Sequence, residues 1–200
     1  MRIVTLLATV LLSGCVAIEA HETPVAPASA APPAPHVSAA LGRTLDARIV
    51  NATGAPIGMA HFREGPWGVV IRLEFNARAL TPGWHGVHLH QNGDCADFAA
   101  GFMASGGHVG KGMDGAMHGL LNPMGPEAGD LANIFAPDAG AFGAELYTPN
   151  VTLAATGQDW RMPLLTERGA ALIVHASPDD HASQPIGGAG ARVACAAIKP

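Results

Sequence analysis

Two histidines in the segment Gly86–His90 have the spacing needed to bind one metal ion together. His88 and His90 are two residues apart, and residues at that spacing in a β-strand point to the same face of the sheet. Val87 and Leu89 would then point the opposite way, into an apolar core. Imidazole is a common ligand for copper and zinc. The pair alone is equally compatible with two surface histidines on a strand, so other residues must decide.

Further imidazoles follow along the chain. His175 ends the apolar run 171–175, where its side chain falls on the face opposite Leu172 and Val174 and so leaves the core apolar. His108 lies in a glycine-rich segment that could bring it to the same place. A site with four imidazole nitrogens is well suited to copper. The predicted copper ligands are His88, His90, His108 and His175.

A second group of donors has a different character. His118, Glu127 and Asp130 combine imidazole with two carboxylates, a set that favours zinc. Glycine, proline and asparagine surround them, so the loop could close around an ion. The alternative is that Glu127 and Asp130 are ordinary acidic residues of a loop.

The elements that must position these residues look like strands rather than helices. The chain has 25 glycines and 16 prolines, with 5% aromatic and 14% charged residues, which favours a loop-rich β protein. Short apolar runs recur between turn signals. The predicted strands cover residues 44–50, 57–62, 69–75, 85–90, 132–135, 151–153 and 170–175. Two long glycine-rich loops, the first at 91–131 and the second at 176–191, are uncommon in length unless they are functional. The sequence therefore predicts an all-β sandwich or barrel.

The N-terminus predicts export from the cytoplasm. Arg2 precedes an apolar stretch at 3–12 that is too short to span a bilayer. The segment 12–15 then resembles a bacterial lipobox, which would be cleaved before Cys15 and leave a lipid on that cysteine. The alternative is an ordinary signal peptide cleaved after Ala20. With either signal the mature protein leaves the cytoplasm, and the lipobox predicts a periplasmic lipoprotein anchored to the membrane of the cell envelope.

The chain divides into three parts on this basis. Residues 1–14 are the predicted lipoprotein signal peptide, and residues 15–40 form an Ala/Pro-rich flexible tether that cannot make a core. Residues 41–200 form the folded domain. The formal net charge of −5 argues against nucleic acid as a partner.

Cysteine usage agrees with a compartment outside the cytoplasm. If Cys15 carries lipid or is removed, Cys95 and Cys195 remain as a single pair in an oxidising environment. A disulfide between them would close a loop of about 100 residues. Two free thiols are the alternative.

Several motifs, in order, now give a family resemblance. From about residue 42 to 198 the chain resembles the copper–zinc superoxide dismutases in their bacterial secreted form. The motifs are Gly86-Val87-His88-Leu89-His90, Gly106-Gly107-His108, residues 118–123, residues 128–131 and residues 187–195. The resemblance implies an eight-stranded Greek-key flattened barrel, similar to a sandwich, with long metal-binding and electrostatic loops. It also implies dismutation of superoxide by redox cycling of copper.

The resemblance implies a role for each matching residue. His88, His90, His108 and His175 would bind copper, and His108, His118, Glu127 and Asp130 would bind zinc. His108 would bridge the two ions and act in catalysis by carrying a proton. Arg192 would hold the superoxide substrate, and Asp179 would link copper and zinc histidines by hydrogen bonds. Cys95 and Cys195 would form the disulfide, and His85 would have a structural role.

Two departures from the family pattern leave alternatives open. Glu127 stands where the family has a third zinc-binding histidine, which adds one negative charge. The segment after His108 also differs, and Lys111 there is either a second positive contributor or a solvated lysine. A non-enzymatic copper-binding lipoprotein of the same fold, or a domain that has lost turnover, therefore stand as alternatives. The family includes monomers and dimers, so a homodimer is an open expectation, and His61 and His181 receive no role.

Overall fold

A computed structural model describes residues 42–200 of the chain. The signal peptide at 1–14, the lipidation site Cys15 and the tether at 15–40 lie outside the described residues. Within the described part, no helix has the length and apolar character needed to cross a membrane.

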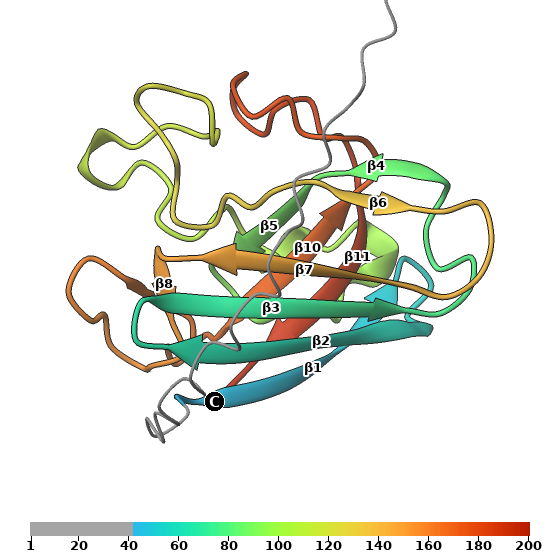
Figure 1. Ribbon diagram of the computed structural model, residues 1–200, viewed down its shortest axis with the longest axis horizontal. Coiled ribbons are helices and arrows are strands. Elements are labelled where there is room, and N and C mark those ends of the chain that lie inside the picture. Colours follow the sequence, from blue (N-terminus) through green and yellow to red (C-terminus); the bar gives the residue numbers. More distant parts are fainter. Residues whose placement is uncertain (1–41) are drawn as a thin grey trace, which may run out of the picture. The chain divides into compact units, whose positions relative to one another are not determined.

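The framework is one antiparallel sheet of seven strands in the order β5-β10-β11-β1-β2-β3-β7, which curls into a half-barrel (Figure 1). The strands are β1 (Thr44–Asn51), β2 (Pro56–Gly65), β3 (Gly68–Phe75), β5 (Val87–His90), β7 (Phe142–Thr148), β10 (Ala170–His175) and β11 (Arg192–Ile198). After β3 the chain crosses to the far edge of this order before β5 begins. Such a crossing is the Greek-key feature of antiparallel folds. The expected all-β class is confirmed.

Two short pairs complete the strand set. β4 (Gly83–His85) pairs antiparallel with β6 (Ile134–Ala136), and β8 (Val151–Thr152) pairs parallel with β9 (Met162–Pro163). The strand expected at 85–90 is thus divided at Gly86, because β4 bonds to β6 while β5 bonds to β10. The strand pairing therefore gives one seven-stranded sheet and two short two-stranded pairs.

Helical structure is minor among residues 42–200. It is limited to three 3₁₀ turns in the first long loop, η1 (Phe98–Ala100), η2 (Met103–Ser105) and η3 (Met113–Gly115). This agrees with the expectation of long loops between strands.

Two strands of the seven-stranded sheet were missing from the sequence-based prediction. β7 (Phe142–Thr148) has a small apolar side, and β11 (Arg192–Ile198) is rich in alanine, so neither shows a strong alternation of large apolar residues. Both strands depend on their neighbours: β7 pairs with β3 along its whole length, and β11 lies between β1 and β10. Pairing across the sheet decides their conformation.

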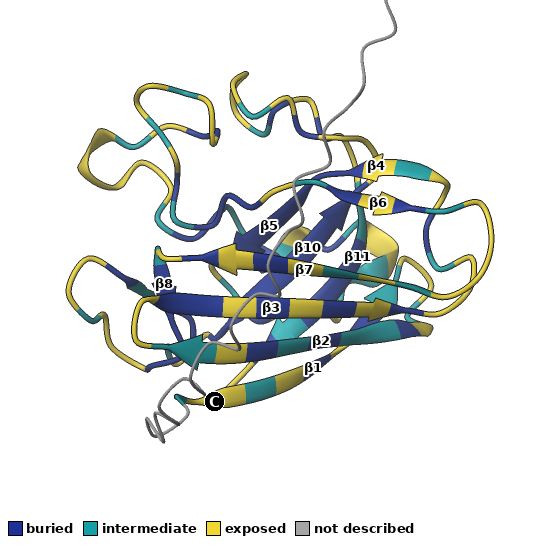
Figure 2. Cartoon of the chain, in the orientation of Figure 1, coloured by how far each residue is buried: buried dark blue, intermediate teal, exposed yellow. Residues whose placement is uncertain are grey.

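The core fills the inside of the curled sheet. In β3 the buried residues Val69, Ile71 and Leu73 alternate with the exposed Arg72 and Glu74, as the sequence predicts (Figure 2). Figure 2 shows the same alternation along the neighbouring strands. The alternation fixes the register, because a slip by one residue would expose the whole apolar set.

The apolar residues beside the histidines also lie in this core. Val87 and Leu89 of β5 and Leu172 and Val174 of β10 are fully buried there. Their strand neighbours therefore face the other side of the sheet. That outer side is covered by the two long loops, so it is also buried.

A disulfide fastens the first long loop to the outer side of the sheet. Cys95 and Cys195 are bonded, with their Cα atoms 5.8 Å apart and a sequence separation of 100. Cys195 packs there with Phe102 and Ile173 in a small second cluster. The prediction of this pairing is confirmed.

Removing the disulfide should destabilise the domain strongly. We expect the double substitution Cys95→Ser with Cys195→Ser to lower the free energy of unfolding by up to about 4–5 kcal/mol, because the unfolded chain loses a long closed loop. Urea unfolding of the metal-free protein, followed by circular dichroism, measures the difference. An unchanged midpoint would contradict the prediction.

Candidate metal centre

Four histidine rings converge beside the loops that cover β5 and β10. His88 and His90 come from β5 and His175 from the end of β10, while His108 comes from the first long loop. The ring centre of His88 lies 4.2 Å from that of His108 and 4.8 Å from that of His175. The ring centre of His90 lies 5.1 Å from that of His108. All four side chains are buried, so they are a cluster and not surface histidines.

The backbone around Gly129 explains how the first loop reaches β5. The Leu89 N–H donates to the Gly129 carbonyl at 2.8 Å, and the Val109 N–H donates to the Leu89 carbonyl at 2.8 Å. The Gly129 N–H in turn donates to the Val109 carbonyl at 2.9 Å. A Cβ at Gly129 would lie 2.2 Å from the Leu89 oxygen, so only glycine permits this approach. These bonds place His108 and Asp130 next to the strand histidines.

Each ring of the cluster has one nitrogen that is buried and has no hydrogen-bond partner among residues 42–200. These atoms are Nδ1 of His88 and Nε2 of His90, His108 and His175. A buried polar atom without a partner costs free energy. Four such nitrogens in one cluster fit a cation that accepts four nitrogen lone pairs, and a nitrogen-rich set suits copper.

The opposite ring nitrogens hold the rings in the tautomer that this role requires. His90 Nδ1–H donates to the Gly106 carbonyl at 2.8 Å, and His175 Nδ1–H donates to the Gly190 carbonyl at 3.0 Å. A carbonyl can only accept, so the proton must sit on Nδ1 and the lone pair on Nε2. The protein thus prepares these lone pairs for a metal ion.

A second donor set shares the His108 ring. Its Nδ1 lies 3.0 Å from Asp130 Oδ1 and 2.8 Å from Glu127 Oε2, while His118 Nδ1 lies 2.8 Å from Asp130 Oδ1. These four side chains are buried. Asp130 Oδ2 accepts the N–H groups of Gly119 and Glu127 at 2.7 and 2.9 Å, which leaves Oδ1 for the cluster. Two imidazoles and two carboxylates form a set that fits zinc.

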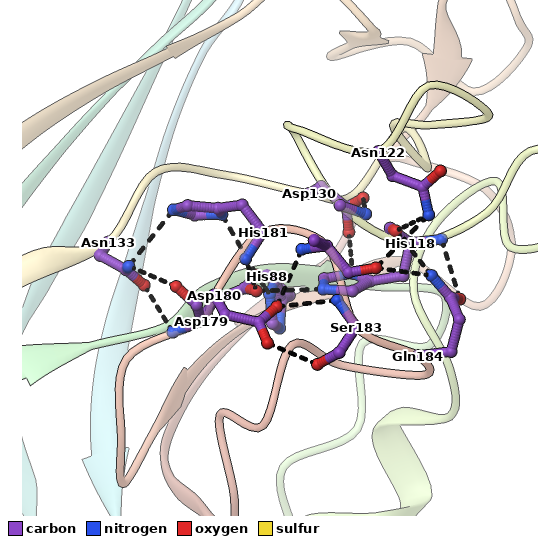
Figure 3. A network of polar contacts seen from close by, with 12 residues as sticks. His88, His118, Asn122, Asp130, Asn133, Asp179, Asp180, His181, Ser183 and Gln184 are labelled. Atoms are coloured by element: carbon purple, nitrogen blue, oxygen red, sulfur yellow. Dashed lines mark hydrogen bonds and ion pairs between the residues drawn. The ribbon is translucent and has the colours of Figure 1, made fainter.

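Asp179 connects the two donor sets through hydrogen bonds to one histidine of each set (Figure 3). Its Oδ2 accepts His88 Nε2–H at 2.8 Å, and its Oδ1 accepts His118 Nε2–H at 3.1 Å. The carboxylate needs Gly187 beside it, because that glycine has a φ of +59° and a Cβ there would overlap Asp179 Oδ1. The two bonds use Nε2 of both histidines and so direct Nδ1 of each ring toward the donor sets.

The ionisation of the second set follows from these contacts. Burial opposes charge on His118, but the hydrogen bonds that its ring donates to the Asp130 and Asp179 carboxylates outweigh this effect and raise its pKa to about 10. Burial also acts against charge on Asp179, yet the bonds from His118 and His88 hold the pKa of its carboxyl well below the usual range. The metal-free site therefore keeps anionic oxygens ready for a cation.

Arg192 lies at the start of β11, next to the nitrogen-rich set. Its Nη1 donates to the Phe102 carbonyl at 2.8 Å and to Ser105 Oγ at 3.0 Å, and its Nη2 donates to the Gly106 carbonyl at 2.8 Å. The same Gly106 carbonyl accepts His90 Nδ1–H. Burial lowers the pKa of Arg192, but a guanidinium stays charged in proteins. A fixed positive charge thus lies beside the imidazole cluster.

Comparison with known families decides the affiliation. The sequence model of the family described as copper/zinc superoxide dismutase (SODC) matches residues 57–198, which is most of the chain.

The chain belongs to the copper/zinc superoxide dismutase family.

Relatives and solved structures agree with this assignment. The chain is 48% identical over 146 residues to a Cu-Zn superoxide dismutase of Caulobacter vibrioides, which covers 73% of this chain and 80% of the relative. A Cu-Zn superoxide dismutase of Aquifex aeolicus is 38% identical over 166 residues, covering 82% and 92%. The crystal structure of a SOD-like protein from Bacillus subtilis superposes with a TM-score of 0.67 at 30% identity, covering 76% of this chain and 97% of that one.

Copper and zinc are the metals of this family, and the described residues offer a matching donor set for each. One ligand atom each from His88, His90 and His175 lies within 4.8 Å of the others, and the same holds for His88, His108, His118 and Asp130. All the ligands predicted from the sequence except Glu127 therefore lie in one of these two adjoining groups. Glu127 is in contact with His108.

The structure also places the residues whose roles were open. His85 is buried, with its ring nitrogens 2.7 Å from the His175 carbonyl oxygen and 2.8 Å from the Thr81 carbonyl oxygen, so both nitrogens contact the backbone. His61 lies on β2, away from the cluster, with Nδ1 2.8 Å from Asp46 Oδ1. Lys111 is exposed.

Several polar residues of the site were not found by sequence reasoning. Ser105 contacts Arg192, and His181 Nδ1 lies 3.4 Å from Asp179 Oδ2. Asn133 accepts the Asp179 N–H at 2.9 Å and donates to the Asp179 carbonyl at 2.8 Å. Nothing in the spacing of these residues distinguishes them from other polar loop residues, so only the folded loops reveal them.

Acid should destabilise the metal-free protein below about pH 6.5. Burial lowers the pKa of His90 to about 2 and that of His175 to about 3, whereas both titrate near 6.5 in the unfolded chain. Below about pH 6.5 the unfolded state therefore binds more protons than the folded state, so the free energy of unfolding decreases as the pH is lowered. We expect the free energy of unfolding to drop by up to about 3 kcal/mol between pH 7 and pH 5.

Among the other shifted groups, only His118 opposes this trend in that window, and it offsets a small part of it. The raised pKa of His118 gives a stabilisation that is complete below pH 6.5 and is lost only as the pH rises toward 10. The lowered carboxyl pKa values of Asp130 and Asp179 matter only below about pH 4. Urea midpoints at pH 7 and 5 measure the trend, and the double variant His90→Gln with His175→Gln should lose most of it.

Proposed function

We propose that this chain converts two superoxide anions and two protons into dioxygen and hydrogen peroxide. The main support is the position of Arg192, whose charged guanidinium donates to the same Gly106 carbonyl as His90 Nδ1–H. It lies beside the four imidazole nitrogens that have no hydrogen-bond partner among residues 42–200. A redox metal alone would need no such cation, whereas an anionic substrate does. His88, His90, His108 and His175 would hold the copper ion.

A bound copper ion would supply the redox chemistry, in which one superoxide is oxidised to dioxygen and another is reduced to hydrogen peroxide. The residues of the chain do the rest. Arg192 attracts the anion in an otherwise acidic protein, and its fixed hydrogen bonds orient the guanidinium. His108 Nε2 has no partner among the described residues, so it can carry a proton for the peroxide product.

The second ion would be held by His108, His118, Glu127 and Asp130. The Glu127 Oε2 atom lies 2.8 Å from His108 Nδ1 without a hydrogen bond, so its lone pair is available for a cation. Two carboxylates would neutralise the charge of a zinc ion, in place of the single carboxylate that the family pattern provides. Zinc has no redox chemistry, so its contribution would be to fix and polarise the His108 ring.

A non-enzymatic copper-binding protein is not favoured. Storage of copper does not require the buried hydrogen bonds that hold Arg192 beside the cluster. The names of the relatives also support turnover, since each of the two reported above is a superoxide dismutase.

We also propose the location of the protein from its N-terminal residues. A signal peptide at 1–14 and a lipid on Cys15 would anchor the domain in the cell envelope through the tether at 15–40, on the periplasmic side. The disulfide supports a compartment outside the cytoplasm. A labelled fatty acid should enter the wild-type protein in the producing bacterium and not the Cys15→Ala variant. A homodimer stays a prediction.

The function is tested by metal loading together with turnover. The purified protein is loaded with copper alone or with copper and zinc, its metal content is measured by mass spectrometry, and superoxide decay is followed after a radiolysis pulse. We expect one copper and one zinc per chain and rapid decay. Copper bound at one equivalent without accelerated decay would overturn the enzyme proposal, and no retained zinc would overturn the role of Glu127.

A further inference from the structure

Two side-chain amides connect the long loops at the backbone of His118 (Figure 3). Asn122 belongs to the first loop and Gln184 to the second. The Gln184 Nε2 donates to the His118 carbonyl at 2.8 Å and to the Ala182 carbonyl at 3.3 Å. The Asn122 Nδ2 donates to the same two carbonyls, at 3.0 Å and 3.4 Å. Each amide therefore contacts one carbonyl of its own loop and one of the other loop.

The orientation of both amides is fixed by their oxygen atoms. Gln184 Oε1 accepts the His118 N–H at 3.3 Å, so Gln184 bonds both backbone groups of His118 as a neighbouring strand would. Asn122 Oδ1 accepts the Met124 N–H at 2.9 Å. A flipped amide would place a donor against an N–H in either case. We call Asn122 and Gln184 the amide clasp.

The clasp acts on the same residue that Asp179 holds from the other side. Asp179 and Gln184 belong to the same loop, and they bond the ring and the backbone of His118, respectively. The Leu121 N–H adds a bond to the His181 carbonyl at 2.9 Å. His118 is fully buried, so an unpaired carbonyl there would be costly. The second loop thus fixes both the position and the direction of the His118 ring.

We propose that Asn122 and Gln184 are positioning residues that set how long the second metal ion is retained. The inference rests on the proposed role of His118 as a ligand of that ion. The clasp touches none of the atoms expected to bind copper. Its loss should therefore speed the release of zinc and leave the release of copper almost unchanged.

The test uses the full protein loaded with copper and zinc. Zinc release is followed with a chromophoric chelator, and copper retention is measured on the same samples. We expect Asn122→Ala and Gln184→Ala each to speed zinc release about three- to tenfold, the range for one lost neutral hydrogen bond. The double variant should exceed the product of the single effects, because each amide alone still satisfies the shared carbonyls and only the double variant leaves them unpaired.

A neighbouring substitution serves as the matched control. Ser183→Ala removes a hydroxyl whose bond goes to Asp180 Oδ2, at 2.6 Å, so zinc release should stay at the wild-type rate. If the double variant released zinc at the wild-type rate, the proposed role of the clasp in zinc retention would be wrong. It would also be wrong if the release of copper and the release of zinc were accelerated equally. A wild-type protein that binds no zinc would instead contradict the proposed second site, so the two failures are distinguishable.

Discussion

The substitution Asp179→Asn should lower the affinity for the second metal ion by about 10- to 100-fold. In the wild type both carboxylate oxygens accept an N–H, one from His88 and one from His118. An amide has one oxygen, so its NH₂ group must face one of these N–H donors. That histidine then either loses its hydrogen bond to residue 179 or carries its proton on Nδ1, the atom that would bind the metal ion.

The measurement is a competition between the protein and a chelator for zinc, with superoxide decay as a second readout. Asp180→Asn is a matched control, because that carboxylate is exposed and bonds to Ser183 and Ala182, away from both rings. If Asp179→Asn kept wild-type zinc affinity, the proposed tautomer control by Asp179 would be wrong. If Asp180→Asn lost as much affinity, the effect would lie in the loop and not in the carboxylate.

The substitution Arg192→Gln should slow superoxide decay by about 10- to 100-fold and weaken its dependence on ionic strength. The net charge of −5 repels an anion, so a local cation must guide it. Arg192 is also held by three hydrogen bonds to Phe102, Ser105 and Gly106, which keep its charge in place. Arg192→Lys should have an intermediate rate, because an ammonium keeps the charge but cannot bond these groups through a planar fork.

The rate is measured at several salt concentrations, with Arg48→Gln as the control. Arg48 lies on β1 and is exposed, so its loss changes the net charge by the same amount without touching the cluster. A similar drop in rate for both variants would mean that net charge, and not the position of Arg192, governs the encounter. Full activity of Arg192→Gln would exclude the proposed steering role.

The histidines that share a face could be predicted because strand geometry is local. The spacing of His88 and His90 places both rings opposite Val87 and Leu89, and the core contains those two apolar residues. The same rule placed His175 opposite Leu172 and Val174. The partnership of Cys95 and Cys195 followed from the number of cysteines, and the disulfide confirms it.

Other features depended on contacts that no local pattern encodes. β7 and β11 have weak alternation and were missed, because their neighbours in the sheet decide their conformation. The division of the strand at Gly86 arises because β4 and β5 have different partners. The signal peptide, Cys15 and the tether remain predictions from the sequence.

For the two donor sets as well, some features follow from the sequence and others only from the tertiary structure. The sequence by itself determined which residue types would supply the proposed metal ligands and which of them share a strand face, because side-chain direction repeats every two residues in a strand. Only the tertiary structure decided which ring nitrogen is left without a partner, because Gly106, Gly190 and Asp179 come from distant segments. It also brought Gln184 to His118 across 66 residues of chain, since hydrogen bonds between loops depend on where the sheet places them.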